Sequence, residues 1–274
     1  MNAKSIRLTV GLLASACAAQ STLAAASSCD QLPGYDALKA ALVSATADET
    51  SGLNLHMWAT IVDRDGIVCA VAFSGVDRGA QWPGSRVISA QKANTGNAFS
   101  LDASSSSNGS GASGGLALST ANLYSAVQPG GSLYGLQHSN PVDTGNAYDG
   151  PVGQIGTAHD PLVGRKVGGV NVFGGGLGLY AAGHKLVGGV GLSGDTSCAD
   201  HSIAWRVRHN LGLDHMAADG ATPAVPGPAG LFAGDTTHPD NIIFDIGAGG
   251  STTGFGHPEC FNLGDASALP AVVP

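Results

Sequence analysis

The chain has 274 residues, of which 43% are hydrophobic and 12% are charged, and its 42 glycines are about twice the ordinary share. This composition excludes a wholly disordered protein, and the lack of a G-X-Y repeat excludes collagen. The net charge of −8, without a basic stripe, excludes nucleic acid as a main partner, because binding the phosphate backbone needs clustered Lys and Arg.

The first 26 residues have the pattern of a secretory signal peptide. Lys4 and Arg7 form the positive start, an apolar run covers residues 8–19, and residues 24–26 supply three alanines at the cleavage site. The run is shorter than the roughly 20 residues of a membrane span. We therefore expect an exported protein, periplasmic or extracellular. A lipoprotein modified at Cys17 is the less favoured alternative.

Four cysteines follow the predicted cleavage site, and an even number in an exported chain predicts two disulfides. Their spacing contains no C-x-x-C motif, so neither a zinc knuckle nor a thioredoxin-like site is expected. Three pairings are possible. We favour Cys29 with Cys69 and Cys198 with Cys260, because the second bond would hold a Pro- and Gly-rich tail.

Helix and hairpin patterns open the mature chain. Residues 35–49 place apolar side chains at helical spacing, which predicts a helix packed on one side. Residues 54–62 and 67–73 are rich in β-formers and are joined by an Asp-Gly turn over 63–66, which predicts a hairpin. This turn lacks the remaining ligands of a calcium loop. A second helix is predicted over 85–99, with Ser85 as its cap.

The middle of the chain gives weaker patterns. A Ser- and Gly-rich tract over 101–115 predicts a loop insertion, and a short helix is expected within 116–127. The predicted strands that follow are 132–138, 152–158, 170–173, 177–181 and 186–193. A last helix is predicted from Asp200, as its cap, to Leu211. Beyond residue 218 only 241–246 resembles a strand.

These elements indicate an α+β fold, an α/β sandwich in which helices pack on a central antiparallel sheet, because consecutive strands are joined by short turns. The expected organisation is a signal peptide over 1–26, a domain over 27–217 that contains the insertion at 101–115, and a Pro/Gly-rich extension over 218–274.

Local motifs alone do not assign a reaction. Residues 176–181 match the loose G-x-G-x-x-A fingerprint, but the predicted strand–strand context does not fit a dinucleotide site. Residues 191–195 lack the second glycine of G-x-S-x-G. His209 and His215 are six residues apart and do not share a helix face, and His184 and His201 are expected at the surface. A serine–histidine–acid arrangement is not evident.

His138 is the histidine best placed to bind an iron porphyrin. It is expected at the end of a strand, beside apolar side chains that include Tyr134 and Leu136, and Pro141 restricts the loop that follows. A neutral imidazole is a common axial ligand of haem iron.

Several segments occur in the order typical of one protein family. They are Val62–Gly66 leading to Ala72–Phe73, Gly75–Asp77, Ser89–Ala93, Gly174–Leu177 with Gly183–Gly194, and the segment with Asp200, Ile203 and Ala204. In these segments the chain resembles the haem-binding, haem-degrading proteins of the GlcG/HbpS type, which are related to the C-terminal domain of PduO. The resemblance implies an α/β sandwich, frequent oligomerisation and haem as the cofactor. The family's haem ligand has no matching position here.

The resemblance predicts an exported haem-binding protein that serves in haem scavenging or degradation. Its expected partners are a small-molecule ligand, namely haem, and further copies of the same chain in a homo-oligomer. One alternative is a non-haem binding or sensory module on the same fold, and a second is a hydrolase or isomerase that uses Asp and His at strand ends. His138 is the predicted axial ligand, with His184 in reserve. The candidate cations for the haem propionates are Arg64, Arg78, Arg86 and Lys92.

Overall fold

The computed structural model describes residues 28–105, 114–265 and 268–274, so the predicted signal peptide and the centre of the Ser/Gly-rich tract lie outside the described residues. The α-helices are α1 (Tyr35–Asp48), α2 (Ser85–Phe99), α3 (Leu123–Ala126), α4 (Leu136–Ser139), α5 (Thr144–Tyr148), α6 (Ser197–Asn210) and α7 (Pro228–Ala233). The strands are β1 (Trp58–Asp63), β2 (Val68–Phe73), β3 (Gly176–Ala181), β4 (Lys185–Ser193), β5 (Ile246–Gly247) and β6 (Gly250–Ser251). Within the described part, none of these helices has the length and apolar character that crossing a membrane requires.

The central sheet is antiparallel and has the strand order β2-β1-β4-β3. The predicted hairpin forms β1 and β2, and its turn is closed by the buried Asp63, whose carboxylate accepts the N–H groups of Asp65 and Ile67. Strand β4 lies in the centre, between β1 and β3, so the two hairpins pair through it. The predicted α+β class, with helices packed on an antiparallel sheet, is confirmed.

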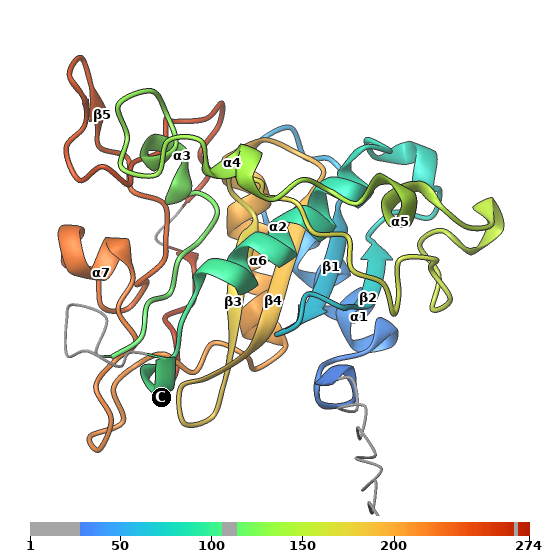
Figure 1. Ribbon diagram of the computed structural model, residues 1–274, viewed down its shortest axis with the longest axis horizontal. Helices are drawn as coiled ribbons and strands as arrows, with labels where there is room; N and C mark the ends of the chain where they lie inside the picture. The colour runs from blue at the N-terminus through green and yellow to red at the C-terminus, as the bar shows by residue number, and fades with distance from the viewer. Residues whose placement is uncertain (1–27, 106–113, 266–267) are drawn as a thin grey trace, which may run out of the picture.

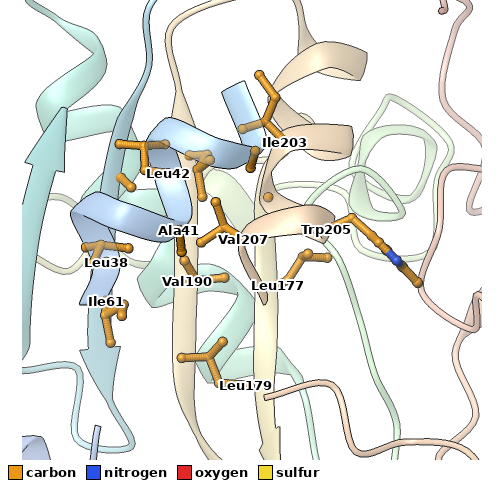
Figure 2. Close-up of a cluster of buried hydrophobic side chains, with 14 of the residues drawn as sticks. Leu38, Ala41, Leu42, Ile61, Leu177, Leu179, Val190, Ile203, Trp205 and Val207 are labelled. Carbon is orange, nitrogen blue, oxygen red and sulfur yellow. The ribbon is translucent and has the colours of Figure 1, made fainter. Parts of the chain in front are cut away.

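Helices cover both faces of this sheet. Helix α2 lies across one face, while α1 and α6 pack side by side on the other (Figure 1). Figure 2 shows how Leu38 and Leu42 of α1 and Val207 of α6 extend toward the apolar side chains of the strands. A second buried cluster, which includes Trp58, lies on the α2 side. The fold is therefore a three-layer sandwich with one apolar core on each side of the sheet.

Glycines on one face of β4 let α2 approach the sheet closely. A Cβ added at Gly189 or Gly191 would overlap the backbone of α2, and a Cβ added at Gly96 on the helix would lie 2.7 Å from the backbone nitrogen of Leu177. Side chains alternate across a strand, so Val190 between the two glycines points to the opposite core. The glycines of β4 thus reflect helix packing rather than a flexible strand.

One buried ion pair joins the helices on opposite sides of the sheet. Lys92 Nζ on α2 lies 2.6 Å from Asp200 Oδ2 on α6, and both side chains are fully buried. The ammonium group also donates to the carbonyl oxygen of Leu192, and the other Asp200 oxygen accepts the N–H of Asp195. Burial raises the pKa of Asp200 to about 6 and lowers the pKa of Lys92, while the attraction between the two charges opposes both shifts.

Parts of the C-terminal segment contact α6. Arg208 forms a fully buried bidentate pair with Asp240, with N···O distances of 2.7 and 2.9 Å. The indole N–H of Trp205 donates to the carbonyl oxygen of Pro270 at 2.8 Å. Val272 belongs to the same buried cluster as α1 and α6. Irregular backbone is therefore held by polar anchors and apolar contacts together.

The structure joins Cys29 to Cys69 and Cys198 to Cys260, which is the nearest-neighbour pairing. The first bond attaches the segment before α1 to β2. The second attaches the C-terminal segment to the first turn of α6.

Several predicted elements are wrong. The segments 132–138, 152–158 and 170–173 are not strands; they form turns, short 3-10 or α-helical pieces and irregular chain, and glycines with positive φ such as Gly135 and Gly156 interrupt them. The helix expected within 116–127 shrinks to α3, and 241–245 is not a strand.

Several residue placements also require correction. Ser85 does not cap the second helix, because it is the first residue of α2 and Gly84 stands at the N-cap without a side-chain cap bond. Asp200 does not cap the last helix, because Thr196 does so by accepting the N–H of Ala199, and Asp200 lies one turn inside α6. His184 and His201 are not at the surface: they are 2% and 0% exposed. Burial lowers the pKa of His201 to about 3, so its imidazole is neutral.

Removing the cation of the buried pair tests its contribution to stability. We expect Lys92→Met to lower the free energy of unfolding by about 3–5 kcal/mol, because it leaves a buried carboxylate without a counter-charge. Lys92→Met combined with Asp200→Asn should recover part of this loss, since the neutral amide still accepts from Asp195 and can donate to Leu192. Urea unfolding of the two variants and the wild type measures the difference.

The same variant should show a pH dependence of known sign. Without Lys92 the pKa of Asp200 rises further above its unfolded value, so stability that is present at low pH is lost as pH rises through the folded-state pKa. The deficit of Lys92→Met relative to the wild type should therefore be larger at pH 7.5 than at pH 5. An equal deficit at both values would contradict this explanation.

The disulfides predict the distribution of stability along the chain. The unreduced mature protein should show no reactive thiol after denaturation, and two or more thiols would contradict this pairing.

Cys260→Ser combined with Cys198→Ser should accelerate hydrogen exchange in residues 241–265 more than in the sheet, because the central strands retain their packing. Exchange measured by mass spectrometry compares the two regions.

Candidate functional site

A pocket of about 570 Å³ lies at the N-terminal end of α2. Its volume falls within the roughly 300–1,000 Å³ of small-molecule sites. Its walls are largely apolar and aromatic, and they include Trp58, Val87, Tyr148 and Ile155. Two of the predicted cations, Arg78 and Arg86, are also in its lining.

Local sequence signals place the pocket beside the start of α2. Asp77 caps a 3-10 helix, Arg78–Ala80, by accepting the N–H of Gly79, and this turn leads through Pro83 into α2. Helix α5 is capped in the same way by Asp143. These two caps fix the segments that carry Arg78 and Tyr148.

Arg86 supports the wall of the pocket and carries no free charge. Its guanidinium makes two hydrogen bonds to Asp160, one of them from Nε at 3.0 Å, and both side chains are buried. Asp160 also accepts the backbone N–H groups of Gly156 and Leu162. The pair therefore holds the irregular segment 156–162 against α2.

Arg78 differs from Arg86 because its charge is unmatched. It forms no ion pair with any residue that the structure describes, and its Nη1 donates to the carbonyl oxygen of Val152 at 2.9 Å. The buried indole Nε1 of Trp58 likewise has no hydrogen-bond partner among the described residues. The lining also contains two carboxylates: Asp77, which caps the 3-10 helix, and Asp149, which pairs with Arg165. The pocket thus combines apolar walls with charged groups of both signs, among which Arg78 is the cation without an ion pair among the described residues.

The other predicted site residues lie elsewhere. Arg64 follows β1 at the far end of the sheet from Trp58, where it donates to the side-chain oxygen of Asn97. The charge of Lys92 is already matched by Asp200. His138 is exposed on α4, and His184, in the β3–β4 turn, places Nε2 2.9 Å from the carbonyl oxygen of Ala217. Of the six predicted residues, the pocket brings together Arg78 and Arg86.

The described residues contain two clusters with the composition of a metal site. They are Cys198, His257 and Cys260, and Cys29, Asp63 and Cys69. Each cluster contains a disulfide, and a disulfide sulfur is not the thiolate that binds a metal. The oxidised protein therefore gives neither cluster the ligands of a metal centre.

One polar pair has no counterpart in the sequence patterns. Ser197 Oγ, on the first residue of α6, lies 2.7 Å from Nε2 of His257. The two residues are 60 positions apart, so a search for local spacing does not connect them. The neighbouring Cys198–Cys260 bond is the one sequence signal that predicts their approach.

Comparison with known proteins gives a family. A family model described as haem degrading protein HbpS-like matches residues 36–208. No sequence among curated proteins matches the chain significantly. Two crystal structures are similar over most of their own length: a PduOC–heme complex, and the protein ORFY of Klebsiella pneumoniae. Each is 22% identical in sequence to this chain. The match to the PduOC–heme complex spans 65% of this chain and 91% of that protein, with a TM-score of 0.41. The match to ORFY spans 64% of this chain and 86% of that protein, with a TM-score of 0.40.

Proposed function

Because the chain belongs to the HbpS-like family of haem-degrading proteins, we propose that it is an exported protein that binds haem in the pocket beside the N-terminus of α2. The observation that carries the proposal is the presence, in one pocket, of apolar walls and an arginine without a counter-ion. Export is supported by the two disulfides, which persist in oxidising compartments.

The residues present fit the chemistry of a porphyrin. Pro83, Tyr148 and Ile155 offer apolar surface for the macrocycle over the buried Trp58 and Val87, and Arg78 offers a guanidinium for a propionate. The pair Arg86–Asp160 holds the wall of the pocket in place, and the charge of Arg86 is already matched by Asp160.

Bound haem supplies the iron and the ring on which degradation takes place. The protein's own part would be to exclude water from the macrocycle, to orient it through Arg78, and to supply a side-chain donor for the iron. Tyr148 is the side chain in the pocket lining that resembles a known haem ligand, because a tyrosine oxygen can ligate haem iron. His138, the ligand predicted from the sequence, lies on α4 outside this lining.

Blocking the pocket tests its assignment. Gly84 is in the lining, and a Cβ added there meets no atom within 4 Å. Gly84→Trp should therefore lower hemin affinity at least tenfold without disturbing the fold. Gly247→Trp is the matched control, because a Cβ at Gly247 also meets no atom within 4 Å and Gly247 is outside the lining of this pocket. Equal affinity of the two variants, measured from the Soret band, would refute the location.

Removing the unmatched cation should weaken binding moderately. We expect Arg78→Ala to raise the hemin Kd about fivefold, which corresponds to about 1 kcal/mol for a partly exposed ion pair. The effect should shrink at high salt, because salt screens this interaction. An unchanged Kd at low salt would argue against propionate binding at Arg78.

The axial ligand is decided by a set of spectra. Tyr148→Phe should change the Soret and charge-transfer bands if the phenolate binds the iron, and His138→Ala should change them if the imidazole does. His215→Ala, a histidine outside the pocket lining, should change neither. A wild-type protein that gives no saturable Soret shift with hemin would instead support a non-haem binding or sensory module on the same fold.

A further inference from the structure

The hydrogen bonds around His257 determine which ring nitrogen carries the proton. Nδ1 lies 2.7 Å from the carbonyl oxygen of Pro258, and a carbonyl oxygen only accepts. Nδ1 therefore carries the hydrogen, and Nε2 is left as an acceptor. The hydroxyl of Ser197, 2.7 Å from Nε2, must then be the donor. The N–H of Gly174 donates in turn to Ser197 Oγ at 2.7 Å.

This is the arrangement of a nucleophile, a general base and a group that orients the base. The imidazole is 3% exposed, and its burial lowers the pKa of His257, so the neutral form that accepts a proton predominates. Tyr124 packs against the ring at a centroid distance of 5.2 Å. The side chain is thus held in one orientation from several directions.

A pocket of about 310 Å³ adjoins His257, and Phe244, Ile246 and Pro258 contribute apolar surface to its wall. Ser197 is half-buried at the first turn of α6 and is not in this lining; it meets the pocket through His257, whose Nε2 lies 2.7 Å from Ser197 Oγ. The N–H groups of Cys198 and Ala199 are bound by Cys260 Sγ and Thr196 Oγ1, so the N–H of Ser197 is the donor in this turn that has no partner among the described residues. Glu259 in the wall disfavours an anionic substrate.

Anchoring of the C-terminal segment does not account for the pair. The Cys198–Cys260 disulfide already fixes this segment to the first turn of α6, and the Arg208–Asp240 pair fixes it again farther along the helix. The Ser197–His257 bond is therefore not needed as a tether. The haem pocket is lined from α5, which lies on the opposite side of the molecule from β5 (Figure 1), so the two sites are separate.

We propose that Ser197 and His257 form a second site, which hydrolyses small uncharged carboxylic esters. Ser197 Oγ attacks the ester carbonyl carbon while its proton passes to Nε2 of His257, and the bond to the leaving alcohol breaks as the alcohol takes that proton. Water then attacks the acyl-serine carbonyl, gives a proton to Nε2 and releases the carboxylic acid, and the proton returns to Ser197 Oγ. The backbone N–H of Ser197, at the N-terminus of α6, stabilises the negative charge of each tetrahedral intermediate.

Covalent labelling of the full mature chain, with its disulfides intact, tests the proposal. A fluorophosphonate probe should add one adduct per molecule, and peptide mapping should place it on Ser197. Hydrolysis of p-nitrophenyl acetate should fall at least 100-fold in Ser197→Ala and in His257→Gln, because general-base catalysis contributes roughly 10²–10⁴. His257→Gln keeps an amide that can contact Ser197 and Pro258 but cannot accept the proton.

Ser125→Ala is the control, because the Ser125 hydroxyl donates to the carbonyl oxygen of Gly256 and has no imidazole partner. It should label and hydrolyse as the wild type does. Absence of label on the wild type at saturating probe, or a label on another residue, would overturn the proposal even if a variant fails to fold. Hemin affinity should be unchanged in His257→Gln, so failure here is distinguishable from failure of the haem assignment.

Discussion

The buried pair of Lys92 and Asp200 is the interaction on which the three layers depend. It is the point at which α2, on one face of the sheet, and α6, on the other, are joined by charge as well as by the sheet between them. Lys92 reaches Asp200 beside Gly175, where an added Cβ would lie 3.2 Å from the ammonium nitrogen and would overlap the backbone of β4. Asp200 then accepts the N–H of Asp195, whose own carboxylate accepts the N–H groups of Leu53 and Leu55. One chain of contacts thus links α2, α6 and the entry to β1.

Helix α6 organises the second half of the molecule because it is used on several sides. One side packs with α1 on the sheet, as Figure 2 shows for Ile203 and Val207. Its other side chains bind the C-terminal segment through Arg208 and Trp205. A long irregular segment has few backbone ladder bonds, so side-chain anchors of this kind take their place. The proposed Ser197–His257 site lies where the regular helix α6 meets the irregular C-terminal segment.

The proposed haem pocket depends on a different irregular segment. Residues 142–170 contain little regular structure, yet Asp160 and Arg86 fix them to α2 by charge-assisted hydrogen bonds. The rigid start of α2 and the first residue of β1, Trp58, form the opposite wall. A rigid scaffold therefore carries loops that shape the site, which is the usual division between the parts of a fold.

Elements with a strong local pattern were predictable from the sequence. The hairpin β1–β2 follows from alternation around an Asp-Gly turn, and α1, α2 and α6 follow from apolar residues at helical spacing, because a periodic pattern needs only one face to be buried. The family resemblance likewise rests on short motifs in order, and the family match over 36–208 confirms it.

The sequence pattern of the segments 132–138, 152–158 and 170–173 was not enough to predict their structure. A few apolar residues between glycines are equally compatible with a strand and with a packed loop. Gly135 and Gly156, with φ near +88° and +76°, decide for the loop. The roles of the two arginines in the pocket also depend on tertiary contacts. Arg86 is paired with Asp160 and supports the wall, whereas Arg78 donates to a backbone carbonyl oxygen and its charge stays unmatched. The sequence by itself determined the periodic elements and the family. Only the tertiary structure decided which charges are matched and that Ser197 meets His257, because pairing across 60 or more residues follows from packing and not from local spacing.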